Sequence, residues 1–181
     1  MRCHKMDFVY QMANTNRHLE LASGLSTSIV YRYWDLIRSK KIRIFQESAA
    51  LSHYGKLGQF AQLIDIRSDE YLKCEEDLSS FSYVQPDFML FKENPFAMNK
   101  AGTRFAGFPD LIIEIWSVSN THFERDAKRN LYSTSSITEH WYISQESDIV
   151  VCYNGSTKLK DKTLTEPMIT LKGLEIDLTW V

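Results

Sequence analysis

The stretch 109-PDLIIEIWSVSN-120 places one glutamate inside a segment that otherwise has the composition of a buried β-strand. From Leu111 to Trp116 every residue except Glu114 is aliphatic or aromatic. A strand that is apolar on both faces is typical of the centre of a sheet covered on both sides. A carboxylate there is costly unless it is paired, protonated, at an exposed strand end or bound to a metal ion. Glu114 alone leaves these four options open.

The length and composition predict one compact domain with a sizeable core. The 181 residues are 44% hydrophobic and 13% aromatic. We expect a single domain over 1–181, in which 1–25 form an N-terminal extension of uncertain structure. The three cysteines, Cys3, Cys74 and Cys152, show no zinc-ligand spacing.

The charge balance and the start of the chain exclude some classes of protein. A net charge of -2 argues against coating of nucleic acid through bulk charge, so contacts with phosphate must come from local patches. The N-terminal segment is too polar for a signal peptide, and no apolar run approaches the roughly 18 residues of a membrane helix. We therefore expect a soluble cytoplasmic protein.

Hydrophobic periodicity predicts an alternation of helices and strands. An amphipathic helix is expected over 26–40, and the capping box of Thr121 and Glu124 predicts a second helix ending near Ser133. The predicted strands are IRIFQES (42–48), FAQLIDI (60–66), YVQPDFMLF (83–91), DLIIEIWS (110–117), HWYIS (140–144) and DIVVCY (148–153), and the last two could pair as a hairpin. ITLKGLEIDLTW (169–180) is a terminal segment with an alternating pattern. We expect 68–80 to be a polar loop or surface helix and 92–108 a turn-rich connection. This order predicts an α/β or α+β fold with a mixed central sheet flanked by helices.

A second acidic residue, Asp87, is expected close to Glu114. It follows Pro86 at the head of a neighbouring strand, where its carboxylate can project from the sheet edge toward Glu114. Two carboxylates on adjacent strands form an oxygen site of the kind that Mg²⁺ or Mn²⁺ prefers. In isolation Asp87 is more simply explained as a turn residue after proline.

Lys128 lies on the helix that follows the Glu114 strand. Because this helix packs back on the sheet, its ammonium group can lie near a metal-bound water or a phosphate oxygen. A helix lysine alone is usually a solvated surface residue, and a Glu114–Lys128 ion pair would satisfy both charges without a metal ion.

The order and spacing of four segments resemble a large bacterial family of restriction endonucleases within the PD-(D/E)xK superfamily. The segments are VQPDFMLF, PDLIIEIWSVSN, RDAKRNLY and ITEHWYIS, and the closing ITLKGLEIDL also resembles the last segment of the family. The resemblance covers about 26–181 and is strongest from Val84 to Ser144. It implies a restriction-endonuclease-like core and an enzyme that cleaves DNA.

The resemblance also implies roles for individual residues. Asp87 and Glu114 would be the paired metal ligands, with the carbonyl of Ile115 as a third. Lys128 would be the catalytic lysine, moved to the helix because Trp116 stands at the strand position where most of the superfamily keeps it. Four residues after Lys128, Tyr132 would pack the helix or position the site.

Some positions depart from the family pattern. The turn SVSN lacks the proline of the family, and Glu124, which the capping box already explains, stands where the family has an aspartate, while Asp126 is displaced. The family has a histidine near the place of Ser26 and a glutamate before it. Glu20 in HLELASG is a weak match, and we do not assign it as a ligand.

Three hypotheses follow. The first is a DNA endonuclease that depends on Mg²⁺ or Mn²⁺, contacts the DNA backbone through RSKKIR (38–43), Arg125, Lys128 and Arg129, and acts as a homodimer. RSKKIR is explained equally well as a basic cluster at the C-terminal end of a helix. The second is a nuclease fold that has lost cleavage and serves as a DNA-binding or protein-interaction module, which the negative charge, the altered turn and the missing strand lysine favour. The third is a structural domain in which Glu114 pairs with Lys128.

Overall fold

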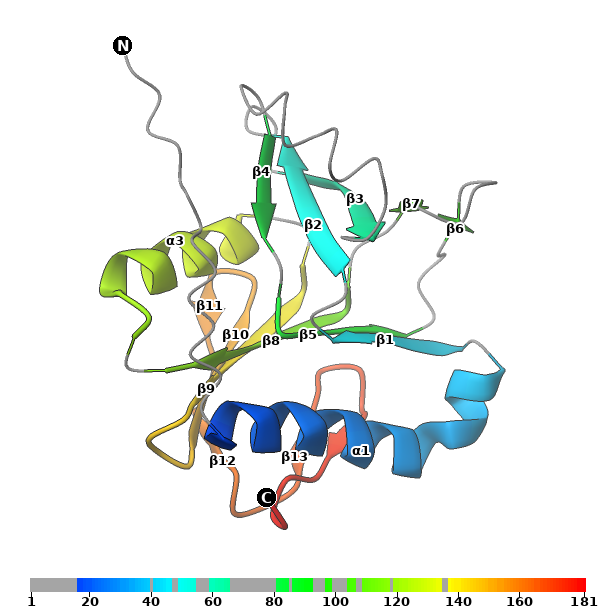
Figure 1. Ribbon diagram of the computed structural model, residues 1–181, viewed down its shortest axis with the longest axis vertical. Helices are drawn as coiled ribbons and strands as arrows, with labels where there is room; N and C mark the ends of the chain where they lie inside the picture. Colours follow the sequence, from blue (N-terminus) through cyan, green and yellow to red (C-terminus); the bar gives the residue numbers. More distant parts are fainter. Residues whose placement is uncertain are drawn as a thin grey trace.

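The fold is built on a mixed seven-stranded sheet (Figure 1). The computed structural model describes residues 16–39, 41–46, 49–54, 59–65, 81–84, 86–92, 97–98, 104–106, 109–117, 119–134 and 137–181. The strand order is β1-β5-β8-β9-β10-β11, with β12 paired to β10. The strands are β1 (Ile42–Gln46), β5 (Phe88–Lys92), β8 (Leu111–Trp116), β9 (Glu139–Ser144), β10 (Ile149–Asn154), β11 (Thr157–Lys158) and β12 (Lys162–Thr163). The predicted mixed central sheet is confirmed.

Strand β8 lies inside this sheet, as its two apolar faces predict. It pairs antiparallel with β5 and parallel with β9, so both edges of its backbone are hydrogen-bonded. Leu111 to Ile115 are all buried. The glutamate in the middle of β8 is therefore enclosed by neighbouring strands as well as by the elements above and below.

Two helices cover opposite faces of the sheet (Figure 1). The first is α1 (Asn16–Arg38) and the second is α3 (His122–Ser133). The core on the α1 side includes Leu21, Leu25, Ile29, Leu90, Ile113 and Trp141. The core on the α3 side includes Met89, Ile112, Tyr132, Ile137 and Tyr142. Alternate residues of β8 thus face the two helices, and Glu114 faces α3.

The start of α3 is fixed by the predicted capping box. The Thr121 side chain accepts a hydrogen bond from the Glu124 backbone at 3.2 Å, and the Glu124 carboxylate accepts one from the Thr121 backbone at 2.8 Å. Both bonds satisfy amide groups that the first helical turn leaves without partners. The helix ends at Ser133, as predicted.

Helix α1 begins earlier than the sequence suggests. It starts at Asn16, ten residues before the predicted Ser26, and its N-terminal turns bury His18, Leu21 and Leu25. Gly24 and the serines and threonine after it are poor helix formers, and they obscure the periodicity. Tertiary packing compensates for this low helix propensity. Gly24 packs so closely against Val181 that a Cβ atom added at Gly24 would lie 2.4 Å from Cγ2 of Val181. Residues 16–25 are therefore helical, and 1–15 lie outside the described residues.

A second sheet of five strands has the order β4-β2-β3-β7-β6. Its strands are β2 (Ala49–Tyr54), β3 (Gln59–Asp65), β4 (Phe81–Val84), β6 (Ala97–Met98) and β7 (Arg104–Ala106). The turn-rich connection expected over 92–108 contains two short strands, β6 and β7. They pair with each other, and β7 also pairs with β3, which is distant in the sequence. The predicted loop or surface helix at 68–80 lies outside the described residues.

The C-terminal half contains two antiparallel hairpins. Strands β9 and β10 pair antiparallel, as expected. The alternating segment at 169–180 contributes to a small hairpin of β13 (Met168–Ile169) and β14 (Glu175–Ile176). Gly173 turns the chain there with a φ of 73°, a backbone conformation that glycine adopts readily. Over the residues that the structure covers, neither helix has the length and apolarity needed to cross a membrane.

Candidate active site

Asp87 and Glu114 lie on neighbouring strands, as the sequence predicts. Asp87 directly precedes β5, and β5 pairs with β8, which carries Glu114. The Oδ2 atom of Asp87 accepts a hydrogen bond from the backbone N–H of Ile115 at 2.6 Å. This bond fixes the Asp87 carboxylate at the end of the sheet beside Glu114. The expected role of the Ile115 carbonyl as a metal ligand stays a prediction.

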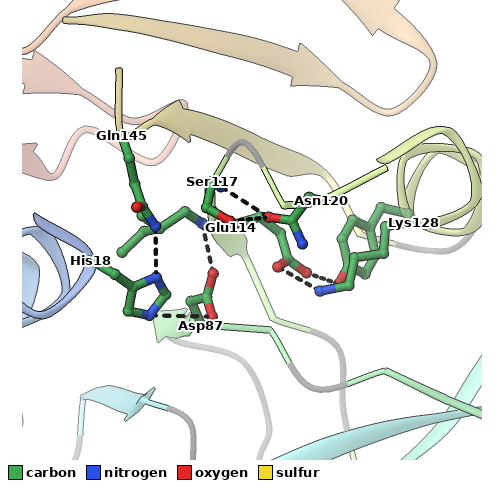
Figure 2. Close-up of polar contacts among 9 residues, drawn as sticks. His18, Asp87, Glu114, Ser117, Asn120, Lys128 and Gln145 are labelled. Atoms are coloured by element: carbon green, nitrogen blue, oxygen red, sulfur yellow. Dashed lines mark hydrogen bonds and ion pairs between the residues drawn. The ribbon is translucent and has the colours of Figure 1, made fainter. Parts of the chain in front are cut away.

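The Glu114 carboxylate meets two side chains from α3 (Figure 2). Its Oε2 atom accepts a hydrogen bond from Nζ of Lys128 at 2.7 Å, and its Oε1 atom accepts one from the hydroxyl of Tyr132. Glu114 is 1% exposed, and the Lys128 side chain is 22% exposed. Lys128 therefore leans back over the strand as predicted. Tyr132 packs in the core and also orients Glu114.

Burial and charge shift the pKa values of this cluster. Burial, and then the neighbouring Glu114, raise the pKa of Asp87 from 3.8 to about 7. Burial lowers the pKa of Lys128, but Glu114 and Asp87 outweigh it and raise this pKa overall. Burial and Glu114 also raise the pKa of Tyr132 well above 10, so its hydroxyl keeps its proton and donates. A site with two crowded acids is one that a bound cation would stabilise.

The polar turn after β8 closes one end of the site. The side chain of Asn120 accepts a hydrogen bond from the backbone of Ser117 at 2.9 Å, and the hydroxyls of Ser117 and Ser119 lie 2.6 Å apart. Arg125 donates to the Ser117 carbonyl at 2.6 Å and lies over the ring of Trp116 at 5.2 Å. These bonds hold Ser117 against Asn120 and the start of α3.

His18 and Gln145, which the sequence patterns did not indicate, also reach the site. His18 of α1 lies with Nε2 3.8 Å from Oδ1 of Asp87, and its Nδ1 lies 3.3 Å from Nε2 of Gln145 (Figure 2). The resemblance placed a histidine near Ser26. The histidine that reaches the site, His18, lies about two helical turns before that position. The exposed Glu20 pairs with Arg17 at 3.4 Å. Extending the periodicity of α1 toward the N-terminus would have put His18 on the buried face.

The donor atoms fit a metal ion held partly by water. Among the residues that the structure describes, no group of three or more His, Cys, Asp or Glu side chains is arranged to hold a metal ion. Mg²⁺ in proteins is commonly bound by one or two carboxylates and several waters. A carboxylate has about four lone-pair sites, so Glu114 can keep Lys128 and Tyr132 and still offer a lone pair to a cation.

Comparison with known proteins shows the fold and the family. A solved structure with a similar fold is described as "Crystal structure of a putative nuclease belonging to DUF820 from Anabaena variabilis ATCC 29413". The two share 14% sequence identity with a TM-score of 0.58, over 91% of this chain and 81% of the other. No curated protein sequence matches the chain. Residues 57–179 match the family Uma2, described as "Putative restriction endonuclease". The match covers more than half of the chain, which therefore belongs to this family.

Proposed function

We propose that the protein is a metal-dependent endonuclease that hydrolyses phosphodiester bonds of DNA. The observation that carries this proposal is the contact of a buried strand carboxylate, Glu114, with Nζ of Lys128 at 2.7 Å, beside a second acid, Asp87, at the end of the adjacent strand. The family and the similar solved structure are both described as nucleases. Family membership alone would not assign an activity, so the geometry of the site has to support it.

Asp87 and Glu114 would hold the cation, with the Ile115 carbonyl as a third ligand. Bound Mg²⁺ or Mn²⁺ would polarise the scissile phosphate and lower the pKa of a coordinated water. Asp87 is suited to this task because the Ile115 N–H fixes one of its oxygens while the other is directed toward His18. Glu114 is held by Tyr132 through its Oε1 atom.

Lys128 would supply positive charge to the reacting phosphate. Its pKa is raised by Glu114 and Asp87, so the ammonium form is maintained at neutral pH. The side chain is 22% exposed, so part of it borders the solvent from which a substrate would approach. A fixed cation in a partly buried site stabilises developing negative charge more strongly than one in water.

DNA would be contacted through local basic groups, since the chain as a whole carries a charge of -2. Arg129 lies on the same helix as Lys128 and pairs with Asp126, and Lys41 is exposed just before β1. Many DNA nucleases that cut both strands pair two active sites, so a homodimer is part of the proposal.

A second candidate is a nuclease fold that binds DNA or a protein without cutting. The observation that favours it is the Glu114–Lys128 ion pair, which satisfies both charges without a cation. Trp116 also favours it, because it occupies the strand position where most of the superfamily keeps a lysine. Its ring packs against that of Tyr142, with 4.2 Å between the ring centroids. This candidate predicts a stable protein that binds its partner whether or not a divalent cation is present.

Calorimetric titration with Mn²⁺ separates the two candidates. The endonuclease proposal predicts binding heat that is lost in Asp87→Ala and in Glu114→Ala, with the folded state checked by circular dichroism. Identical titrations for the wild type and both variants would sink the proposed metal site. Cleavage of supercoiled plasmid DNA in the presence of Mg²⁺ then tests the reaction, and a protein that binds metal but cuts no DNA supports the second candidate.

The role of Lys128 is tested by Lys128→Met, which keeps most of the length of the side chain and removes its charge. We expect plasmid cleavage to fall about 100-fold, as when one preorganised charge donor is removed from an active site. Lys158→Met is the matched control, since Lys158 of β11 also pairs with a carboxylate, Asp161, at 3.2 Å and belongs to none of the proposed contacts. Equal rates for the two variants would exclude the proposed role of Lys128.

A further inference from the structure

Arg125 differs from the two other long cationic side chains of α3, because it has no carboxylate partner in the part of the chain that the structure describes. Lys128 pairs with Glu114, and Arg129 pairs with Asp126. The ion pairs of the described residues do not include Arg125. Arg125 is partly buried, and a cation that is partly removed from water without a counter-charge costs free energy. A bound anion would remove this cost.

The hydrogen bonds of the Arg125 guanidinium group are also incomplete. Its Nη2 atom donates to the Ser117 carbonyl at 2.6 Å. Its Nε atom is buried and meets no acceptor among the described residues. Buried donors are rarely left without an acceptor, so this one calls for an explanation. A guanidinium group has several N–H donors in a planar fork that matches the oxygens of a phosphate. Arg125 therefore keeps donors for an incoming oxyanion.

Trp116 and Ser117 hold the guanidinium group in place. Its central carbon lies 5.2 Å from the centroid of the Trp116 ring, within the range of a cation–π contact. The Trp116 ring in turn packs against Tyr142 of β9, with 4.2 Å between the centroids. A group that is fixed before it meets a ligand loses less conformational entropy on binding. Arg125 is therefore preorganised to bind an anion.

Arg125 lies beside Lys128, the proposed catalytic lysine. The two residues are three positions apart on α3, so their Cβ atoms lie on the same side of the helix, about 5–6 Å apart. Both side chains reach back to β8 and the turn after it, where Lys128 contacts Glu114 and Arg125 contacts Ser117. A DNA strand carries one phosphate per nucleotide, so a strand that meets Lys128 can present its next phosphate to a second, neighbouring cation.

We propose that Arg125 binds the phosphate next to the scissile one, and that Trp116 positions Arg125 for this contact. The inference rests on the proposed endonuclease and adds a second phosphate contact to it. Lys128 would act on the phosphate that reacts, whereas Arg125 would contact one that does not. Loss of Arg125 should therefore weaken the ground state and the transition state equally, which raises KM and leaves kcat unchanged.

The salt dependence of DNA binding tests this contact. Fluorescence anisotropy of a labelled duplex, with Ca²⁺ in place of Mg²⁺ and the DNA checked for cleavage, gives the association constant at each salt concentration. Each phosphate contact contributes about -0.9 to the slope of log K against log[salt]. Arg125→Met should make the slope shallower by about 0.9, whereas Arg125→Lys keeps the charge and should retain it. Arg32→Met is the matched control, since Arg32 of α1 pairs with Glu175 at 2.6 Å and should leave the slope unchanged.

Two further readouts separate phosphate binding from a purely structural role. In plasmid cleavage, Arg125→Met should raise KM about tenfold and leave kcat within about threefold of the wild type. Trp116→Leu should retain the salt slope and weaken DNA binding about two- to fivefold, because it loses the ring and keeps the charge. An Arg125→Met slope equal to that of the wild type would overturn the inference. A Trp116→Leu variant that binds as tightly as the wild type would exclude the positioning role of Trp116.

A measurement on the wild type decides the question if Arg125→Met does not fold. Because Nε of Arg125 is buried, its proton should exchange slowly with water and give a resolved signal in protein labelled with ¹⁵N-arginine. The signal that is missing in Arg125→Lys belongs to Arg125, and saturating DNA should shift it. An unchanged signal would overturn this inference alone, because cleavage by Asp87, Glu114 and Lys128 does not depend on it. A wild-type protein that neither binds nor cuts DNA would overturn both.

Discussion

Two glutamates in adjacent strands of the same sheet are buried equally deeply but have different surroundings. Glu114 in β8 and Glu139 in β9 are each 1% exposed. Glu139 accepts hydrogen bonds from the Trp141 indole at 2.8 Å and from the Leu171 backbone at 2.6 Å. Glu114 contacts a lysine and a tyrosine and has Asp87 nearby.

The difference teaches that burial of a carboxylate does not by itself mark an active site. Glu139 has neutral donors that are fixed in the backbone and in the core, and they tie β9 to the segment before β14. Neutral donors of this kind satisfy a buried acid and stabilise the fold. Glu114 has partners that can interact with a substrate or a cation, since Lys128 is partly exposed and Asp87 competes for the same positive charge.

The largest expected contrast is between Glu114→Gln and Glu139→Gln. Loss of a metal-binding carboxylate should lower plasmid cleavage by roughly 1,000-fold or more, because several kcal/mol of charge stabilisation in the transition state depend on the cation. Glu139→Gln should leave cleavage within about threefold of the wild type. It should instead lower the free energy of unfolding by about 1–3 kcal/mol, because one buried N–H donor then faces an amide N–H₂ group.

Cleavage assays and urea unfolding of both variants measure this contrast. If cleavage falls to the same extent in both, buried acids in this sheet act only through stability, and the distinction between the two glutamates is wrong.

The pH dependence of stability gives the next largest effect. In metal-free protein the folded state raises the pKa of Asp87 from 3.8 to about 7, so between these values it holds a proton that the unfolded chain has released. The free energy of unfolding contributed by Asp87 therefore falls as the pH rises from about 4 to about 7, by at most about 4 kcal/mol, and stays low above that range.

Urea unfolding of the wild type and Asp87→Asn in a chelating buffer, from about pH 4 to about pH 8, tests this sign. The variant should lack the decline, so the difference between the two proteins should grow in favour of the variant as the pH rises. Glu139→Gln provides the comparison, because burial also raises the pKa of Glu139 while its two N–H donors lower it in part. Parallel curves for the wild type and Asp87→Asn would contradict the shift.

The smallest effect is expected for Tyr132→Phe. The variant keeps the buried ring and removes the hydroxyl that donates to Glu114. A hydrogen bond to a charged group contributes about 1.5 kcal/mol, so cleavage should fall about tenfold. Tyr142→Phe is the control, because Tyr142 is similarly buried but its hydroxyl contacts His140 at 2.9 Å. A loss in kcat for Tyr132→Phe that is matched by Tyr142→Phe would show that only core packing is affected.

Local patterns predicted the half of the site that lies in β8 and α3. The apolar run around Glu114 and the capping box at Thr121 are complete within a few residues, so both are visible in the sequence. His18 was missed because the start of α1 depends on a distant contact of Gly24 with Val181. Glu139 was not singled out because it precedes the apolar run of β9, and its partner Leu171 belongs to the C-terminal segment.

The contacts of the site also differ in how much chain each one closes during folding. Lys128 and Tyr132 are 14 and 18 residues from Glu114, within one strand-helix unit. Asp87 is 28 residues from Ile115, and His18 is 127 residues from Gln145. Because the entropy lost on closing a loop grows with its length, the acid-lysine pair should assemble early and the histidine last. Amide exchange near the start of α1 should accordingly be faster than in β8, so a partial opening of the first helix would release His18 and leave Glu114 and Lys128 in place.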